Sequence, residues 1–400
     1  MKYAIIIPDG AADEPHESLG GKTALQVARL PEMDRVAREG VLGRSRNVPD
    51  HLNPASDVAT LSLFGYDPAK YYTGRAPLEA AAMGVALGPD DWAVRCNLMT
   101  IEDGLMSDFT AGHITSEEGA ELIAALQASL GSDEFEFHAG VSYRNLMVVR
   151  GRAGVPCFDP TTKTTPPHDV PDQPAEQHLP IGLGSERLRS LMECGSALIA
   201  GHDVNKRRVT SGRRPANAIW LWGQGQAPAM PRFEDLHGLK GAIISAVDLV
   251  RGVGVLAGWT RIDVPGATGY LDTDYAAKGR YGVEALKAND IVCVHVEAPD
   301  EASHEGRGDA KVEALERIDR EIVGPIHEAL RSYGDYRILI SPDHSTLLRT
   351  RAHDRAPVAW AMCGKGLAAC GLPYDEASAV AANGPFFEEG WRLMVRFLGS

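Results

Sequence analysis

The chain of 400 residues has a formal net charge of −14 and a pI of about 5.4, which excludes the broad basic face that binding to nucleic acid or anionic membranes requires. Hydrophobic residues make up 44%, charged residues 24% and aromatic residues 6% of the chain, the proportions of an ordinary globular protein. Because one hydrophobic core stops growing below this length, we expect two domains.

The cysteines and the N-terminus indicate the cellular compartment. The six cysteines are scattered and form no CxxC pair, which is typical of reduced, mostly buried thiols. The N-terminus begins directly with an apolar strand pattern, and no apolar run approaches membrane-spanning length. We therefore expect a cytoplasmic protein that is neither secreted nor inserted into a membrane, with neither nucleic acid nor membrane as a partner.

The first predicted elements are a strand and a helix. Residues 3–7 form an apolar, β-branched strand that ends at Pro8 and passes directly to Asp9. The glycine-rich segment that follows lacks the spacing of a P-loop or of a dinucleotide fingerprint, so we assign no nucleotide site to it. Residues 30–40 then predict an amphipathic helix that ends at Gly40.

A second helix is predicted to begin close to Ser56 and to continue through Leu63. The free N–H groups and the dipole at a helix N-terminus favour an anion, including a phosphate group. Ser56 is therefore a candidate nucleophile near a phosphate site, and the alternative is a simple N-cap. No GxSxG motif surrounds this serine, so a hydrolase of that type is not indicated.

The character of the chain changes near Gly88, and shorter elements follow. They comprise a helix at 77–83, strands at 93–98, 146–149 and 218–222, helices at 116–130 and 185–200, and a Pro/Thr-rich loop at 158–177. An arginine cluster lies at positions 207, 208, 213 and 214. It is either a set of solvated loop charges or a recognition site for carboxylate or phosphate, which guanidinium groups bind in bidentate fashion.

The last part of the chain repeats the pattern of a strand followed by an acid. After a helix at 275–286, a strand at 291–296 precedes Asp300 and His304, which one helical turn would place on the same face. The alternative is an N-cap aspartate beside a solvated histidine. A clear amphipathic helix is predicted over 312–330.

The third strand, residues 338–340, ends at Ser341-Pro342 and leads to Asp343 and His344, with His353 nearby. Taken alone this pair could be a surface turn. Three strands that each deliver an acid to the carboxyl edge of a sheet indicate instead a ligand site, and these residue types suit Zn²⁺ or Mn²⁺. We expect a discontinuous metal-binding domain at 1–88 and 281–400, with residues 89–280 inserted as a second domain.

Several segments together resemble a known family. They are MKYAIIIPDGAADEP at 1–15, PASDVATLSLFGYDPAKYYTGRAPLEA at 54–80, HVEAPDEASHEG at 295–306, and SPDHS at 341–345 with His353. They resemble the cofactor-independent phosphoglycerate mutases, specifically the shorter archaeal-type group within the alkaline phosphatase superfamily, over nearly the whole chain. This resemblance implies an α/β fold in which an alkaline-phosphatase-like sheet is sandwiched by helices and carries a smaller inserted α/β domain.

The resemblance also implies a reaction and its cofactors. A serine is phosphorylated by 3-phosphoglycerate and returns the phosphoryl group to the 2-hydroxyl, with two divalent metal ions (Mn²⁺, Zn²⁺ or Mg²⁺) and without bisphosphoglycerate. Carried over to this chain, Ser56 is the nucleophile and binds one metal together with Asp9, Asp343 and His344. The other metal is bound by Asp300, His304 and His353. The inserted domain would then hold the small phosphorylated substrate.

From their positions we expect four residues to contact this substrate, namely His113, Arg144, Arg214 and Lys278. Each of them could equally be a surface or structural polar residue. The stretches at 295–300 and 219–225 resemble a bacterial branch for which a metal-dependent homoserine kinase role has been proposed. A metal-dependent phosphatase and a non-enzymatic metal-binding module, in which Ser56 would be only a cap, are further alternatives. We favour the mutase because the arginine cluster could bind a carboxylate and no Walker-type loop is present.

Overall fold

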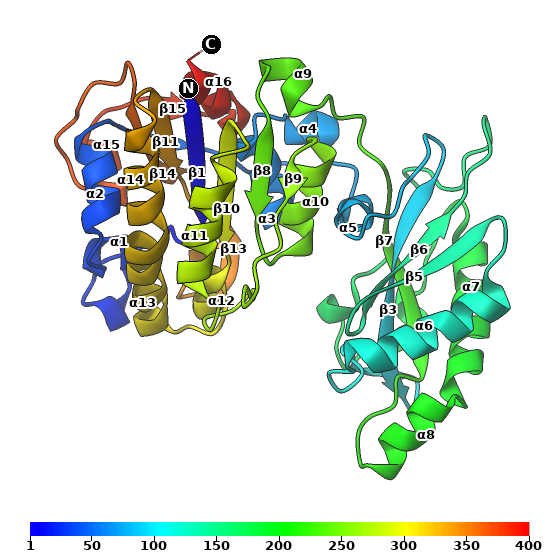
Figure 1. The fold of residues 1–400 in the computed structure, drawn as a ribbon. Helices are drawn as coiled ribbons and strands as arrows, with labels where there is room; N and C mark the ends of the chain where they lie inside the picture. Colours follow the sequence, from blue (N-terminus) through cyan, green and yellow to red (C-terminus); the bar gives the residue numbers. More distant parts are fainter. Residues whose placement is uncertain (400) are drawn as a thin grey trace. The chain divides into compact units, whose positions relative to one another are not determined.

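The computed structural model describes residues 1–399 and divides into two compact units (Figure 1). The first unit contains Met1–Tyr72 and the chain from Ala229 onward, and the second contains Thr73–Pro228. Each unit has its own sheet and its own hydrophobic core. The second unit is therefore an insertion in the first.

The main sheet of the first unit has eight strands within the described residues. They are β1 (Lys2–Pro8), β2 (Val41–Ser45), β8 (Gly241–Ile244), β9 (Thr260–Arg261), β10 (Ile291–Val296), β11 (Tyr336–Ile340), β14 (Val358–Gly364) and β15 (Phe386–Phe387). Their order across the sheet is β15-β2-β14-β11-β1-β10-β8-β9. The strands from β11 to β9 run parallel, and β14 runs antiparallel to β11. A two-stranded hairpin, β12 (Ser345–Leu347) with β13 (Ala352–Asp354), follows β11.

Helices cover both faces of this sheet. Ala4 and Ile6 of β1 belong to a core cluster that includes residues of α2, α11, α13 and α14, whereas Tyr3 packs its ring against Phe397 of α16 on the opposite face. The helices of the unit are α1 (Ala24–Val27), α2 (Pro31–Arg38), α3 (Ser56–Leu63), α4 (Pro68–Tyr71), α9 (Phe233–His237), α10 (Asp248–Leu256), α11 (Tyr275–Ala285), α12 (Ala298–His304), α13 (Gly308–Ile318), α14 (Gly324–Ser332), α15 (Glu376–Ala381) and α16 (Leu393–Leu398). The predicted α/β class, with a sheet sandwiched by helices, is confirmed.

The helix predicted over 312–330 is interrupted by a π-helical turn, Asp319–Val323, between α13 and α14. The Asp319 carboxylate accepts hydrogen bonds from the N–H groups of Met33 and Glu32, at 2.7 and 3.2 Å. The N-cap residue of α2, Leu30, provides no side-chain cap of its own. The π turn therefore begins at the residue whose carboxylate caps the N-terminus of α2.

The second unit is built on an antiparallel sheet (Figure 1). Its strands are β3 (Trp92–Glu102), β4 (Leu105–Asp108), β5 (Phe135–Val141), β6 (Arg144–Val149) and β7 (Ala218–Gln226), and its helices are α5 (Arg75–Ala82), α6 (Ser116–Leu130), α7 (Ser185–Ala200) and α8 (Asp203–Thr210). Residues 158–177 contain only two short 3-10 turns, in agreement with the predicted loop. The arginine cluster lies only partly in a loop: Arg207 and Arg208 belong to α8, whereas Arg213 and Arg214 follow it.

The boundaries of the units differ from the expected ones at 88/89 and 280/281. Helix α5 already belongs to the second unit, since Ala76 and Ala80 form a core cluster with Ala93 of β3 and Leu146 of β6. At the other boundary, β8 pairs with β10 and so extends the main sheet of the first unit. The chain therefore returns to the first unit about fifty residues earlier than its polarity pattern predicted.

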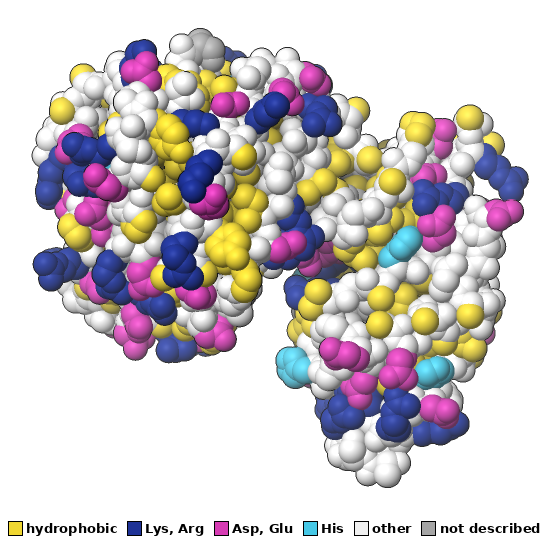
Figure 2. Space-filling view, in the orientation of Figure 1, with side chains coloured by type: hydrophobic (Ala, Val, Ile, Leu, Met, Phe, Trp, Pro, Cys, Tyr) yellow, Lys and Arg dark blue, Asp and Glu magenta, His cyan; other side chains and the backbone are white. Residues whose placement is uncertain are grey.

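The surface and the thiols agree with the composition. On the face drawn in Figure 2, lysine and arginine side chains are interspersed with aspartate and glutamate, and no broad basic patch is visible there. Nothing among the helices of residues 1–399 has both the length and the apolar character to cross a membrane. The cysteines are free thiols, and Cys96, Cys157, Cys293 and Cys363 are buried.

Candidate functional site

Three neighbouring parallel strands carry acidic residues to one edge of the main sheet. β1 ends at Pro8 and is followed by Asp9, β10 leads into α12 with Asp300, and β11 is followed by Asp343. Since β1 pairs in parallel with both β10 and β11, these carboxyl ends lie side by side. The edge where ligands bind in open α/β sheets is therefore strongly acidic. Figure 1 places α12 and β13 at this end of the sheet, away from the N-terminus.

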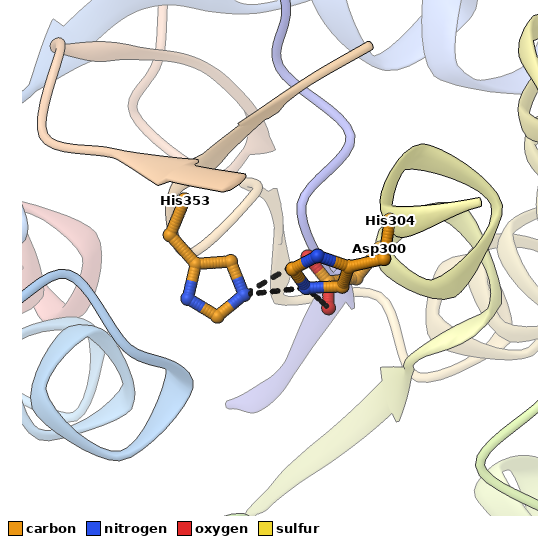
Figure 3. Close-up of side chains that lie close together, drawn as sticks. All are labelled: Asp300, His304 and His353. Carbon is orange, nitrogen blue, oxygen red and sulfur yellow. Dashed lines mark hydrogen bonds and ion pairs between the residues drawn. The ribbon is translucent and has the colours of Figure 1, made fainter. Parts of the chain in front are cut away.

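The first cluster consists of Asp300, His304 and His353, whose side chains converge (Figure 3). His304 Nε2 lies 3.1 Å from Asp300 Oδ2, and His353 Nε2 lies 3.4 Å from Asp300 Oδ1. The two Nε2 atoms are 2.9 Å apart. Asp300 and His304 come from opposite ends of α12, one helical turn apart as predicted, and His353 comes from β13.

The tautomers of these histidines are set by backbone carbonyls. His304 Nδ1 is 2.9 Å from the carbonyl oxygen of Arg351, and His353 Nδ1 is 3.1 Å from that of Pro54. A carbonyl only accepts, so both Nδ1 atoms carry protons, and in the neutral imidazoles both Nε2 atoms present lone pairs. Two lone pairs at this separation repel unless a cation lies between them. The pair is therefore a candidate site for a metal ion or a shared proton.

Electrostatics supports the same conclusion. Burial opposes ionisation of Asp300, but the hydrogen bonds with His304 and His353 hold its pKa well below the usual range. The hydrogen bond with Asp300 in turn raises the pKa of His304 to about 9. The carboxylate thus attracts a positive charge to the histidine pair, and either a proton or a metal ion can supply that charge.

The second cluster is formed by Asp9, Asp343 and His344, all fully or almost fully buried. The groups whose ligand atoms lie close enough to share one ion differ from the expected set: Asp9 groups with Asp300 and His344, and again with His295 and Asp343. His344 Nε2 lies 3.5 Å from Asp9 Oδ1 and 3.4 Å from Asp343 Oδ2. These two carboxylate oxygens are buried and have no hydrogen-bond partner among the described residues. Asp343 Oδ1, in contrast, accepts from the N–H groups of Gly10 and His344, at 3.2 and 2.9 Å. Each carboxylate therefore keeps one oxygen available for a cation.

Thr346 sets the tautomer of His344. Its single hydroxyl proton is donated to Asp300 Oδ1, so Thr346 Oγ1 can offer only a lone pair to His344 Nδ1 at 3.3 Å. The other neighbour of Nδ1 is the carbonyl of Ser345, also at 3.3 Å. Nδ1 therefore carries the proton, and Nε2 presents a lone pair toward the two free carboxylate oxygens. Thr346 also links the two clusters through one hydroxyl group.

Ser56 lies beside the second cluster. It is the first residue of α3 and is 9% exposed, and its Oγ is 3.3 Å from His344 Nε2. The N-cap position belongs to Ala55, which has no capping side chain, so Ser56 is not the N-cap considered from the sequence. Its hydroxyl therefore points to the cluster of Asp9, Asp343 and His344.

Burial and crowding leave this edge short of positive charge. The pKa of Asp9 is raised well above its usual value by burial and by the charges of Asp343 and Asp300. Burial and the neighbouring Asp9 raise the pKa of Glu297 in the same way.

Gly10 allows the backbone after β1 to lie close to Asp300, because a Cβ on residue 10 would lie only 2.5 Å from Asp300 Oδ1. The donor set of carboxylates and Nε2 lone pairs, with orphaned buried oxygens, fits Mn²⁺ or Zn²⁺.

Three of the four predicted substrate residues belong to the second unit. The side chains of His113, Arg144 and Arg214 are exposed. His113 ends a run of left-handed backbone, with φ of 51° at Ala111, 63° at Gly112 and 50° at His113. Arg214 Nη1 donates to the carbonyl of Ser107 at 2.9 Å. Arg214 therefore contacts β4, the strand that precedes the turn carrying His113.

The fourth residue, Lys278, lies on α11 in the first unit and is fully buried. Its Nζ is 3.4 Å from the carbonyl oxygen of His295, and burial lowers its pKa to about 8. The charge of Glu297 opposes this lowering of the pKa. We expected this side chain to contact a substrate. In this structure the side chain is covered by protein, and a substrate could reach it only after the surrounding residues move.

Sequence reasoning did not select the residues that hold the ligands in place. His295, Ser245 and Thr346 are buried around the clusters and make hydrogen bonds to Asp9, His295 and Asp300, respectively. The available signal for His295 was an imidazole within an otherwise apolar strand. In the second unit, the sequence placed Arg208 in one cluster with the exposed Arg207, Arg213 and Arg214, although Arg208 is fully buried.

Comparison with known proteins gives consistent matches. A family profile described as 2,3-bisphosphoglycerate-independent phosphoglycerate mutase matches residues 37–205. A protein of that name from Methanothrix thermoacetophila is 51% identical over 381 residues, covering 95% of both chains. A probable 2,3-bisphosphoglycerate-independent phosphoglycerate mutase from Geobacter sulfurreducens is 49% identical and covers 100% of both chains.

Solved structures agree over the full length. A Pyrococcus horikoshii protein aligns with a TM-score of 0.82 and 28% identity, covering 100% of this chain and 97% of its own. The cofactor-independent phosphoglycerate mutase of Thermoplasma acidophilum aligns with a TM-score of 0.69 and 27% identity, covering 100% and 99%. The architecture of both units is therefore shared with proteins of this kind.

Proposed function

Because the chain belongs to the 2,3-bisphosphoglycerate-independent phosphoglycerate mutase family, we propose that it interconverts 3-phosphoglycerate and 2-phosphoglycerate through a phosphoserine on Ser56. The observation that carries this proposal is the position of the Ser56 hydroxyl. Its oxygen is 3.3 Å from His344 Nε2, beside two buried carboxylate oxygens that have no partner among residues 1–399. A serine in such surroundings is suited to phosphoryl transfer.

Two cation sites form part of the proposal. Asp9, Asp343 and His344, with Ser56, would hold one divalent ion, since His344 Nε2 lies close to both carboxylates and to the Ser56 hydroxyl. Asp300, His304 and His353 would hold the other. Ions bound there would lower the pKa of the serine hydroxyl and neutralise negative charge on the phosphoryl oxygens. The orphaned oxygens and the facing Nε2 lone pairs support this assignment.

The reaction consists of two transfers. The Ser56 hydroxyl loses its proton and its oxygen attacks phosphorus, the bond from phosphorus to O3 of the glycerate breaks, and O3 takes up a proton. The 2-hydroxyl then loses a proton and attacks the phosphorus of the phosphoserine, the bond from phosphorus to the Ser56 oxygen breaks, and that oxygen takes up a proton. The glycerate must stay bound and reorient between the two transfers, and water must be kept from the phosphoserine.

The second unit would bind the rest of the substrate. His113, Arg144 and Arg214 are exposed, and their side chains suit the carboxylate and the phosphate. Guanidinium groups bind carboxylates in bidentate fashion, which would keep the glycerate in place during reorientation.

The test is a ³¹P NMR time course of Mn²⁺-loaded protein with 3-phosphoglycerate, without nucleotide or bisphosphoglycerate. The proposal predicts growth of the 2-phosphoglycerate resonance to equilibrium. Formation of inorganic phosphate alone would indicate a phosphatase instead. An unchanged substrate would contradict the mutase assignment, and ATP with homoserine would then be tested.

A further inference from the structure

The two oxygens of Asp9 have different environments. Asp9 Oδ2 is 2.8 Å from His295 Nε2, and both side chains are fully buried. Asp9 Oδ1 has no hydrogen-bond partner among the described residues and lies 3.5 Å from His344 Nε2. One oxygen is therefore fixed by the protein, and the other is left for a cation.

The hydrogen bonds of His295 determine its tautomer. An Asp9 carboxylate that binds a cation is ionised and only accepts, so in the cation-bound protein the bond to Asp9 places a proton on His295 Nε2. Nδ1 then accepts from the hydroxyl of Ser245, whose Oγ is 3.1 Å away. Ser245 Oγ in turn accepts from the N–H of Val247 at 3.0 Å. Its hydroxyl proton is directed to His295 Nδ1, which is nearer than the other acceptor, the Val247 carbonyl at 3.5 Å. The result is a chain of donors from Ser245 through His295 to Asp9.

The order of the strands explains this chain. Ser245 follows β8, His295 is near the end of β10, and Asp9 follows β1. β8, β10 and β1 are adjacent and parallel, and Ile7 is in register with His295. The three residues therefore form a row along the carboxyl edge of the sheet, on the side that leads to the second cluster.

His295 could instead be a cation ligand itself, because its nitrogen lies in one group with oxygens of Asp9 and Asp343. A ligating nitrogen needs a lone pair, and the proton that His295 Nε2 donates to Asp9 occupies that position. The geometry therefore favours a role outside the ligand set.

We propose that His295 is a positioning residue: it donates Nε2–H to Asp9 Oδ2 and so directs Asp9 Oδ1 to the cation, and Ser245 fixes its tautomer. The inference rests on the proposed function, since it assumes a cation at the cluster of Asp9, Asp343 and His344. Partners of this kind commonly contribute about 10- to 100-fold to metal affinity.

The experiment is a Mn²⁺ titration by equilibrium dialysis, performed in a His304→Ala background so that only the site at Asp9 is measured. His295→Leu is expected to weaken Mn²⁺ binding by about 10- to 100-fold. His295→Gln, which retains an N–H donor toward Asp9, is expected to bind within a few-fold of the background. Ser245→Ala is expected to lie between the two.

The outcomes separate this inference from the proposed function. Unchanged Mn²⁺ affinity in His295→Leu, or equal weakening in the leucine and glutamine variants, would overturn the donor role. If His295→Leu does not fold, Ser245→Ala decides: several-fold weaker binding supports the inference, and unchanged binding overturns it. Failure of the wild-type protein to bind Mn²⁺ would instead overturn the two-cation proposal.

Discussion

The carboxyl edge of the main sheet and the loop around His113 use buried polar groups in opposite ways. At the edge, Asp9 and Asp343 each keep one buried oxygen without a partner among residues 1–399. In the loop, the fully buried guanidinium of Arg208 contacts the carbonyls of Ala111, Gly112 and Arg214 as well as the Glu118 carboxylate. The edge therefore lacks positive charge, which a cation can supply, whereas the loop is internally compensated.

This difference relates to the task of each region. Incomplete hydrogen bonding at the edge costs free energy that a bound cation recovers. Complete hydrogen bonding around Arg208 can instead hold three consecutive residues in left-handed backbone, of which Ala111 and His113 are not glycine and are costly there. The edge therefore has the character expected of the proposed ion site, and the loop that of a fixed support for exposed side chains.

The largest effect is expected at Ser56. Ser56→Ala should lower kcat by about 10⁴-fold or more, because the phosphoryl group loses its acceptor. Steady-state rates of 2-phosphoglycerate formation check this. Ser62→Ala on the same helix is the matched control, since Ser62 donates to the Asn47 carbonyl at 2.6 Å and only about 1 kcal/mol of stability should be lost. Substantial activity in Ser56→Ala would remove the nucleophile assignment.

Removing divalent ions should reveal the charge deficit of the edge. Exhaustive chelation is expected to abolish activity. It should also lower the free energy of unfolding by about 2.7 kcal/mol per site, relative to protein in free Mn²⁺ at 100 times the Kd of that site. Urea unfolding with and without Mn²⁺ measures the loss, and added Mn²⁺ should restore activity. Full activity after chelation would contradict the cation sites.

Removing the hydrogen bonds and the ion pair of Arg208 should lower the free energy of unfolding. Arg208→Met is expected to cost about 3–5 kcal/mol, because it removes one partner of a buried ion pair and leaves three carbonyls without that donor. Arg213→Met, which removes an exposed partner of the same Glu118, should cost less than about 1 kcal/mol. Urea unfolding of both variants gives the comparison, and equal losses would contradict the special role of Arg208.

The buried Lys278 should make stability depend on pH. Its pKa is lowered from 10.5 to about 8 by burial, so between these values the unfolded chain binds more protons than the folded one. The free energy of unfolding should therefore rise with pH over this window, by up to about 3 kcal/mol relative to Lys278→Met. Urea titrations of both proteins from pH 7.5 to 10 measure the difference. A difference that does not change with pH would contradict the prediction.

The smallest effect is expected for an exposed arginine of the second unit. Arg214→Ala should raise KM by about 10- to 100-fold through loss of a charge-assisted contact with the substrate. Arg207→Ala is the control, because Arg207 is exposed and pairs with Glu121. Similar KM values in the two variants would remove Arg214 from the substrate site.

Prediction from the sequence succeeded where chemistry follows a strand directly. Asp9 comes immediately after β1 and Asp343 is the third residue after β11, so the parallel pairing of these two strands brings the two acids to the same edge. Helix α6 was predicted at the bounds observed, since its apolar period and its capping Thr115 are local signals. The family resemblance assigned the candidate ligands to two groups. The structure brings Asp300, His304 and His353 together as one group, whereas Asp9 lies in one group with Asp300 and His344 and in another with His295 and Asp343.

Prediction did not reach features that depend on distant contacts. The burial of Lys278 and Arg208 follows from packing, and their local sequence looks like that of any exposed basic residue. The return to the first unit was placed too late because β8 has only four residues, and its membership of the main sheet follows from pairing with β10. The π turn likewise depends on contact with α2.

Crystallographic analysis of the Mn²⁺-loaded protein, with anomalous difference maps at the manganese edge, is the most direct test of the two proposed cation sites. We expect one peak among Asp300, His304 and His353 and a second among Asp9, Asp343, His344 and Ser56. A single peak, or peaks away from the carboxyl edge of the sheet, would contradict the claim that this edge is built for two cations.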